Sequence, residues 1–178
     1  MGKTIKLAVF LAIVAGLAGG ALSLVYNMTD PIIQEAKIAK VKEKLVLMYT
    51  SGEEFKAVES TDLKDYTGLT ELYEASSGGT VKGYIYKCSV VGYGGASTPI
   101  EFLIALDNDG TYKGFQALDL SGETSGFGSK VGEDTFKNGI VGKNIGDGID
   151  TITGATISSA AVVGGIEQAA AHYEANFK

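Results

Sequence analysis

The sequence contains no arginine, no tryptophan, one cysteine, one histidine and two prolines among its 178 residues. All 15 basic residues are therefore lysines, and 21 acidic residues give a net charge of −6. Nucleic-acid binding needs cations clustered against the phosphate backbone, so this balance argues against nucleic acid as a partner. A lone cysteine, Cys88, excludes a disulfide, a cysteine-based zinc site and a protein-ligated iron–sulfur cluster within the chain.

The scarcity of histidine limits the catalytic chemistry that the chain can perform. A threonine such as Thr156 needs an adjacent base to act as a nucleophile. His172 lies sixteen positions further on, about 24 Å along a helix, which is out of reach. We therefore predict no catalytic residue and no metal site. His172 is expected to be a solvated surface residue and Cys88 a small buried residue within a strand.

One long apolar run is present near the N-terminus. No charge lies between Lys6 and Asp30, and residues 7–26 are mostly apolar. Twenty helical residues span about 30 Å, the thickness of a bilayer's hydrocarbon core. Lys3 and Lys6 precede the run, so the N-terminus is predicted in the cytoplasm and the following domain on the outer face of the cell membrane. A cleaved signal peptide is the alternative, which the apolar continuation to residue 26 disfavours.

The remainder predicts an α+β fold with an antiparallel sheet, because strands follow one another and helices flank them. Asp30-Pro31 predicts the start of an amphipathic helix over 31–49. Strands are expected at 69–75, 81–91, 100–106 and 112–120, and a terminal helix at 155–177. The expected organisation is a cytoplasmic segment 1–6, a transmembrane helix 7–26, a juxtamembrane helix and connection 27–68, and a domain 69–178.

Two stretches rich in glycine and hydroxyls depart from these patterns. Residues 119–130 include three glycines within seven residues, which lets backbone N–H groups approach a flat or anionic ligand, although an ordinary surface loop has the same composition. In residues 150–159, Thr153 is predicted to cap a helix that continues with Gly154-Ala155-Thr156. The Thr156 hydroxyl, with those of Ser158 and Ser159, would then lie among unpaired N–H groups that favour a phosphate.

These stretches carry a family resemblance. Asp150-Thr151-Ile152-Thr153-Gly154-Ala155-Thr156 resembles the flavinylation motif of the FMN-binding domain family, Asp-x-x-Ser/Thr-Gly-Ala-Ser/Thr. Glu123-Thr124-Ser125-Gly126-Phe127-Gly128 resembles that family's Glu-Thr-Pro-Gly-Leu-Gly loop, from which Ser125 and Phe127 depart. A serine leaves the loop less rigid, and an aromatic ring there could stack on a flavin. Gly92-Tyr93-Gly94-Gly95 with Pro99-Ile100 resembles a third stretch, Gly-Tyr-x-Gly-Pro-Ile.

The resemblance implies one FMN, joined covalently through a phosphoester to Thr156 by a separate Mg-dependent flavin transferase that consumes FAD. It also implies cofactor contacts at Asp150, Thr153, Gly154, Ala155, Glu123, Thr124, Gly126, Phe127 and Gly128. With the apolar run, the order of motifs is similar to that of the G subunits of the Rnf electron-transport complex. The related C subunits of the sodium-pumping NADH:quinone oxidoreductase are usually longer.

This resemblance implies a membrane-anchored electron carrier within an ion-translocating ferredoxin:NAD oxidoreductase, without a complete active site of its own. Its partners would be membrane subunits bearing an iron–sulfur centre and a second flavin. Two other functions stay open. One is a non-redox binding module that holds an anionic ligand at the helix N-terminus formed by residues 153–156. The other is an FMN carrier that serves an extracellular reductase.

Overall fold

The structure is a computed structural model. It describes the backbone of residues 2–50, 54–59 and 61–178, and the side chains of these residues except 4, 21–22, 24–40 and 61. The chain divides into two compact units, residues 1–40 and 41–178.

Residues Gly2–Met48 form one helix, α1. The predicted separate helix starting at Asp30-Pro31 is wrong, because helical backbone continues through both residues. Proline removes one backbone hydrogen bond but keeps a φ compatible with a helix, so the neighbouring turns can continue past it.

Within the described residues, no helix combines the length and the apolar character needed to cross a membrane. The end of the span predicted at 7–26 lies outside the residues whose side chains are described, namely at 21–22 and 24–26.

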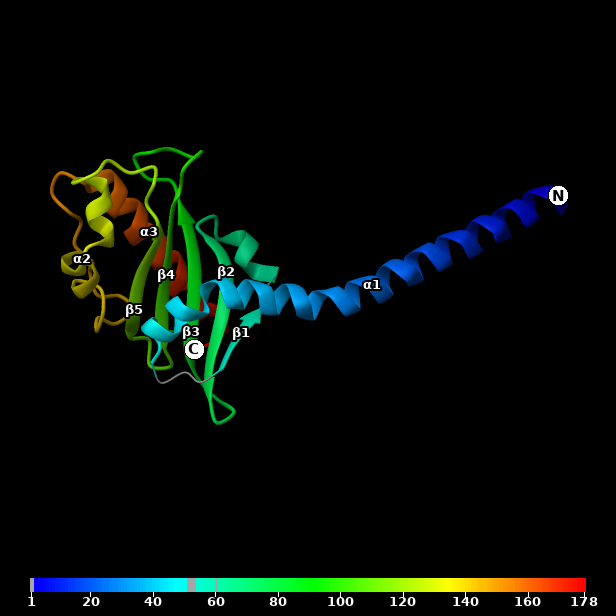
Figure 1. The fold of residues 1–178 in the computed structure, drawn as a ribbon, viewed down its shortest axis with the longest axis horizontal. Helices are drawn as coiled ribbons and strands as arrows, with labels where there is room; N and C mark the ends of the chain where they lie inside the picture. Colours follow the sequence, from blue (N-terminus) through cyan, green and yellow to red (C-terminus); the bar gives the residue numbers. More distant parts are fainter. Residues whose placement is uncertain (1, 51–53, 60) are drawn as a thin grey trace. The chain divides into compact units, whose positions relative to one another are not determined.

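Within the described residues of the 41–178 unit, one antiparallel sheet contains five strands paired in chain order (Figure 1). They are β1 (Glu54–Val58), β2 (Leu69–Ser77), β3 (Thr80–Val90), β4 (Ile100–Asp107) and β5 (Tyr112–Asp119). The predicted α+β class and the four predicted strands are confirmed. β1 and the short 3-10 helix η1 (Thr61–Asp65) precede Leu69, so the sheet begins earlier than the pattern indicated.

The β2–β3 hairpin turns at Gly78 and Gly79, whose φ angles are +58° and +76°. Two successive positive φ angles are typical of the tight hairpin turn whose twist matches the flanking strands. The sequence Ser-Ser-Gly-Gly therefore predicts this turn correctly.

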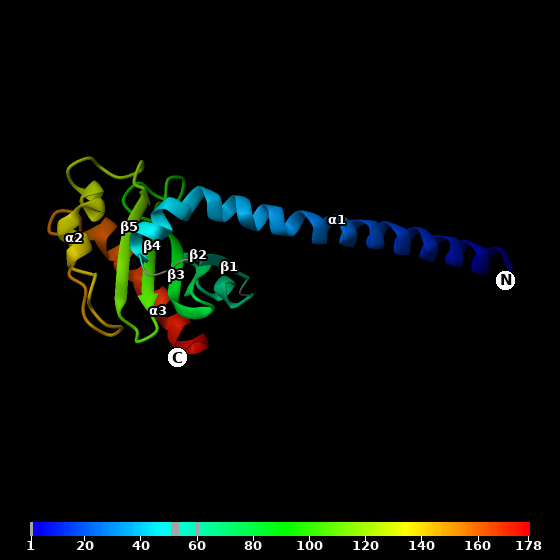
Figure 2. The same cartoon turned by 60° about the horizontal axis from the view of Figure 1, so that its bottom comes forward.

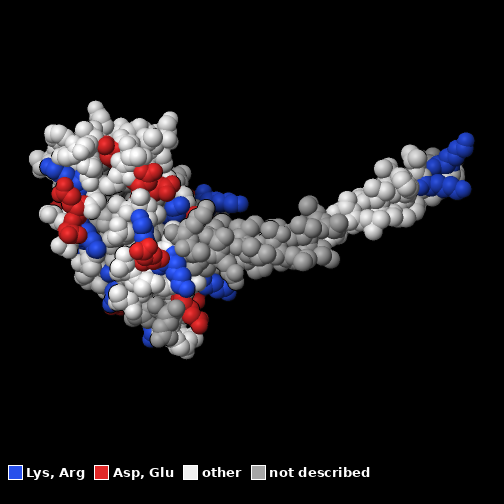
Figure 3. Space-filling view, in the orientation of Figure 1, with Lys and Arg blue, Asp and Glu red and all other residues white. Residues whose placement is uncertain are grey.

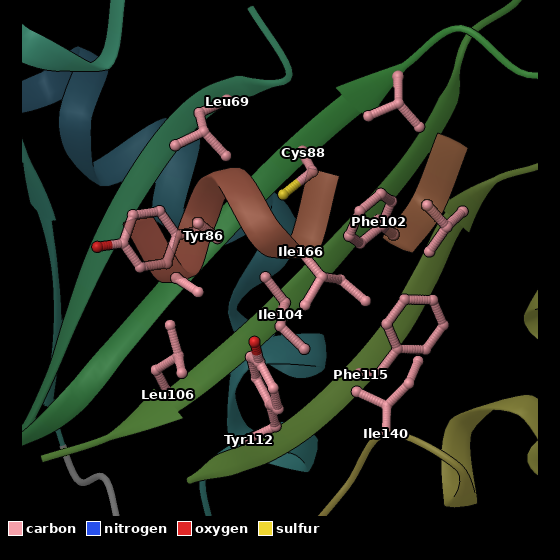
Figure 4. Close-up of a cluster of buried hydrophobic side chains, with 14 of the residues drawn as sticks. Leu69, Tyr86, Cys88, Phe102, Ile104, Leu106, Tyr112, Phe115, Ile140 and Ile166 are labelled. Carbon is pink, nitrogen blue, oxygen red and sulfur yellow. The ribbon is translucent and has the colours of Figure 1, made fainter. Parts of the chain in front are cut away.

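Helix α3 (Thr156–Asn176) covers one face of the sheet (Figure 2). Figure 4 shows the resulting core, in which Tyr86, Phe102, Ile104 and Phe115 of the strands lie around Ile166 of the helix. Alternate residues along each strand point to this face, as the two-residue period of a strand requires. The predicted helix over 155–177 is thus confirmed.

The last turn of α1 and the following Tyr49, both within the 41–178 unit, pack on the opposite face. The Tyr49 hydroxyl lies 2.5 Å from the Lys82 carbonyl oxygen and 2.8 Å from Asp107 Oδ1. Burial and the Asp107 carboxylate raise the pKa of Tyr49, so the hydroxyl keeps its proton. Close packing at Gly83 supports this contact, since a Cβ there would lie 2.8 Å from the Tyr49 hydroxyl oxygen.

The sequence-based predictions for Cys88 and His172 had different outcomes. Cys88 is fully buried, as predicted, and burial raises the pKa of its thiol. The prediction that His172 is a solvated surface residue is wrong, because its side chain is also fully buried. The reason is its position on the face of α3 that also carries Ala169 and Tyr173, which pack into the same core.

After β5 the chain forms a 3-10 helix, η2 (Gly128–Gly132), and a short helix, α2 (Asp134–Asn138). An irregular segment with several turns then leads to α3. These connections, with the loop between β3 and β4, carry the motifs singled out in the sequence.

Candidate functional site

The topology brings the three sequence motifs to one end of the sheet. Both β3 and β5 are antiparallel to β4, so they run in the same direction, and the loops that follow them leave the same end of the sheet. Figure 1 shows that α3 also starts at this end of the sheet. The two loops touch at Gly94, where a Cβ would overlap the backbone of Gly122.

A pocket of about 430 Å³ opens where these segments meet. Its walls are Tyr93 from the first loop, Thr124, Phe127 and Gly128 from the second, and Gly154, Ala155, Thr156, Ile157 and Ser158 from the start of α3. Three of these residues are large, apolar and exposed: Tyr93, Phe127 and Ile157 are 66%, 57% and 60% accessible to solvent. Large apolar side chains left this exposed around a cavity are typical of ligand or partner sites.

The prediction that Thr153 caps the last helix is wrong. The N–H of Ala155 donates to the Ile152 carbonyl oxygen at 2.9 Å, which closes a β-turn with Thr153 and Gly154 at its centre. Gly154 has a φ of +84°, which a type II turn requires at its third position. Ala155 therefore becomes the N-cap residue, and Thr156 is the first residue of the helix.

The three hydroxyls at this helix end have different surroundings. The Ser159 hydroxyl donates to the Ala155 carbonyl oxygen at 2.8 Å and accepts from the Ile152 N–H at 2.9 Å, which fixes the turn against α3. The buried Ser158 hydroxyl donates to Glu123 Oε2. Thr156 is exposed, and within the described residues its hydroxyl makes no hydrogen bond.

The helix end favours an anion beside Thr156. The first N–H groups of an α-helix have no carbonyl partner within the helix and lie at the positive end of its dipole. Here these are the N–H groups of Thr156, Ile157 and Ser158, all residues of the pocket wall. A phosphate is the ligand that such a helix N-terminus binds readily.

Glu123 lies behind the pocket wall rather than in it. Its side chain is 9% exposed. The carboxylate accepts hydrogen bonds from the Ser158 hydroxyl and, at 3.3 Å, from the Gly94 N–H. Glu123 therefore connects both loops to the start of α3 without lining the cavity.

Charge is scarce around the pocket. Residues 91–99, 124–129 and 151–166 contain no charged side chain. In Figure 3 the upper edge of the domain, where these loops lie in Figure 1, is largely white. The Lys130 ammonium lies 5.9 Å from the centre of the Phe127 ring, within the range of a cation–π contact.

The structure separates Asp150 from the other predicted site residues. Asp150 is exposed and lines a second pocket, of about 470 Å³. The walls of that pocket are Lys130, Glu133, Thr135, Phe136, Gly139, Ile149, Asp150, Thr151 and Ile152. Thr153 and Gly126 line neither cavity. Thr153 is the second residue of the β-turn, and Gly126 lies in the turn of the glycine loop, with a φ of +75°.

Two residues of the pocket were missed as site residues in the sequence. Tyr93 lies within the Gly-Tyr-Gly-Gly stretch, so the signal was present but gave no role for its side chain. Ile157 gave no signal, because an apolar residue in a helix is ordinarily assigned to the core. Its position just after the first helical residue turns it outward instead.

The residues present fit a flat, phosphate-bearing group such as FMN. The pocket has the volume of a small-molecule site, an aromatic side chain on each of two loops, and an exposed hydroxyl at a helix N-terminus. In the described part of the chain, no group of three or more His, Cys, Asp and Glu side chains is placed to hold a metal ion.

Comparison with known proteins gives consistent results. Residues 92–171 match the model of the FMN-binding domain. The chain is 26% identical over 170 residues to the G subunit of the proton-translocating ferredoxin:NAD(+) oxidoreductase complex of Clostridium ljungdahlii, covering 89% of this chain and 85% of the relative. It is 28% identical over 175 residues to the G subunit of an ion-translocating oxidoreductase complex of Methanosarcina acetivorans, covering 92% and 91%.

Among solved structures, the crystal structure of Shewanella oneidensis NqrC matches with 17% identity and a TM-score of 0.46, covering 67% of this chain and 66% of that one. At this TM-score the likeness adds nothing to the interpretation of the site.

Proposed function

We propose that this chain is the FMN-bearing G-type subunit of an Rnf-type ion-translocating ferredoxin:NAD oxidoreductase complex, because residues 92–171 match the FMN-binding domain. The relatives named as G subunits of such complexes span most of this chain's length, which supports the assignment. Other subunits of that complex would then be its partners. Bound FMN supplies one- and two-electron chemistry at its ring system, and the chain itself supplies attachment, orientation and surroundings.

One observation supports covalent attachment of FMN to Thr156. Thr156 presents an exposed hydroxyl at the first position of α3, in the wall of a pocket of FMN-compatible size. We assign Thr156 as the residue joined to the phosphate of FMN. The free N–H groups of the first helical turn would hold the phosphate oxygens, and this needs no arginine, because a phosphodiester carries a single negative charge.

The attachment step balances with FAD as the donor. The Thr156 oxygen forms a bond to the phosphorus on the riboflavin side of FAD, and the phosphoanhydride bond breaks. AMP leaves, and the hydroxyl proton passes to a base supplied by the transferase or by solvent. No base of this chain is needed, which agrees with the absence of a nearby histidine in the sequence.

Tyr93 and Phe127 have a second role in this proposal. Their exposed rings come from two different loops and line the same cavity as Thr156. Aromatic rings can contact a flat ring system and shield it from water. Because both rings are exposed, a flavin in contact with them would lie at the domain surface, where a redox partner can approach it.

The intact mass of the full-length chain tests the covalent linkage. The chain is produced with a flavin transferase and examined by mass spectrometry and by in-gel fluorescence after denaturation. We expect the wild type to carry one FMN, Thr156→Ser to retain it and Thr156→Ala to lose it. Thr151→Ala is the matched control, because Thr151 is exposed but lines the second pocket. An unmodified wild type would contradict the linkage and leave a reversible anion-binding module.

The membrane anchor belongs to the same proposal. Residues 7–26 contain no charged residue, and a run of this length matches the hydrocarbon thickness. The two lysines before it favour a cytoplasmic N-terminus and an outer FMN-binding domain. Extraction of membranes with alkaline carbonate tests the anchor: the full chain should stay in the pellet, and release into the supernatant would contradict it.

A further inference from the structure

Glu123 connects three segments that are distant in sequence. Its Oε2 accepts the hydrogen bond of the Ser158 hydroxyl on α3, and its Oε1 accepts the Gly94 N–H of the loop after β3. Glu123 itself belongs to the loop after β5. Both carboxylate oxygens are therefore used, by two different segments, and the side chain is nearly shielded from solvent.

Two motif glycines make room for this carboxylate. A Cβ at Gly92 would overlap Glu123 Oε1, and a Cβ at Gly128 would overlap Glu123 Oε2. Backbone therefore approaches the carboxylate from both sides at a distance that a side chain would prevent. These glycines pack against Glu123, whatever group occupies the pocket in front of it.

The N-terminus of α3 lacks the groups that usually stabilise a helix end. Its N-cap residue is Ala155, whose methyl group cannot accept a hydrogen bond, and its first turn, Thr156–Ser159, contains no acidic residue. Glu123 supplies a hydrogen-bond acceptor from another part of the chain, and it holds the first turn through the side chain of Ser158.

The same hydrogen bond determines where Thr156 points. Residues two apart on an α-helix lie about 200° apart around its axis. Fixing Ser158 toward the buried carboxylate therefore turns Thr156 outward, and the structure has Ser158 buried and Thr156 exposed. A rotation of the first turn would move the Thr156 hydroxyl away from the pocket.

We propose that Glu123 is a positioning residue for flavin attachment: its carboxylate holds the first turn of α3 through Ser158 so that the Thr156 hydroxyl faces the pocket. This inference rests on the proposed linkage at Thr156. It assigns Glu123 no contact with the flavin and no transfer of a proton. The bond that matters is the hydrogen bond to Ser158, formed before the cofactor arrives.

The test compares attachment rates of the full-length chain with purified transferase, FAD and Mg²⁺. Glu123→Ala and Ser158→Ala remove the two sides of the bond and should each slow attachment about ten-fold, because small misplacements of a reacting group are costly. Glu123→Gln should keep a rate close to the wild type. Its carbonyl oxygen can accept from Gly94 N–H and its amide can donate to the Ser158 oxygen. The control is Glu167→Ala, which removes an exposed carboxylate further along α3.

A second readout does not depend on FMN. Amide hydrogen exchange of the unmodified chain at Ser159, whose N–H donates to the Ala155 carbonyl oxygen, should be faster in Glu123→Ala and Ser158→Ala than in the wild type, and unchanged in Glu167→Ala. If Glu123→Ala fails to fold, Ser158→Ala, a smaller change, carries the test.

Three results are distinguishable. Attachment at the wild-type rate in both alanine variants would overturn the positioning role. A glutamine variant as slow as Glu123→Ala would also overturn it, because charge rather than placement would then be the requirement. A wild type that acquires no FMN would overturn the proposed function instead, while the exchange data would still decide whether Glu123 holds the helix end.

Discussion

The Tyr86 hydroxyl oxygen and the Nδ1 atom of His172 lie 3.0 Å apart, and both side chains are fully buried. This hydrogen bond joins β3 to α3 inside the core. The rings of Tyr66 and Tyr86 meet the imidazole edge-on, with centroids 5.3 and 5.5 Å away. Burial among these rings lowers the pKa of His172, and the negative charge of Asp62 partly opposes that effect.

The buried imidazole makes the domain's stability depend on pH. In the unfolded chain a histidine titrates near 6.5, whereas in the folded chain His172 titrates below this value. Between the two values the unfolded state binds more protons, so stability falls as the pH falls through this range. We expect a loss of up to ~1.4 kcal/mol per pH unit. Urea unfolding followed by the near-ultraviolet circular dichroism of the tyrosines measures it.

The matched variant for this prediction is His172→Gln, which cannot titrate. It should be less stable than the wild type at pH 7.5 but should lose less stability between pH 6.5 and pH 5.5. Equal pH dependence in the two proteins would show that His172 is not responsible.

Adjacent glycines of α3 should respond oppositely to alanine. A Cβ at Gly164 meets no atom within 4 Å, so Gly164→Ala should stabilise the domain by about 0.5–1 kcal/mol through helix propensity. A Cβ at Gly165 would lie 2.8 Å from Val90 Cγ1 and 2.9 Å from Phe102 Cζ, so Gly165→Ala should destabilise it by about 1–3 kcal/mol.

The thiol of Cys88 gives a direct readout for this pair. Cys88 is buried and is the chain's one cysteine, so pulse labelling in rising urea at pH 8 reports the opening of the core around it. If the urea midpoints of Cys88 labelling shift in the same direction in Gly164→Ala and Gly165→Ala, the packing described around Gly165 would be contradicted.

Gly154 should be intolerant of substitution for a different reason. A Cβ there has space, with Phe127 Cδ1 as its nearest neighbour at 3.9 Å, but the φ of +84° is unfavourable for a residue with a side chain. Gly154→Ala should cost about 1–2 kcal/mol and shift the turn that leads into Thr156. Gly148→Ala is the control, because that glycine has open space and no positive φ. Urea midpoints that match in the two variants would argue against the strained turn.

Local patterns predicted the central part of the fold well. Alternation and turn residues located β2 to β5, and the Gly78-Gly79 turn was readable because its geometry demands glycine. β1 was not predicted, since Glu54–Val58 is a short strand that pairs only with β2. His172 was misassigned because its burial depends on where α3 lies on the sheet, which periodicity around one histidine does not reveal.

The candidate site was predictable as a set of segments but not as a geometry. The motifs indicated Thr156, Phe127 and Gly128, which the structure brings to one pocket. Thr153 was taken for a helix cap because its side chain suits that role, but the positive φ of Gly154 creates a turn that moves the cap to Ala155. The link between Glu123 and Ser158 depends on tertiary packing across 35 positions and has no local signal.

The meander topology also sets the order in which the site can mature. Each strand pairs with the one made just before it, so the sheet can assemble while the chain is still being synthesised. Thr156, the residue that we propose to carry FMN, belongs to α3, which follows all of these strands. The pocket beside it combines the loops after β3 and β5 with the start of α3, so it is complete only once the sheet and α3 have come together, and we expect a modifying enzyme to act on the folded domain.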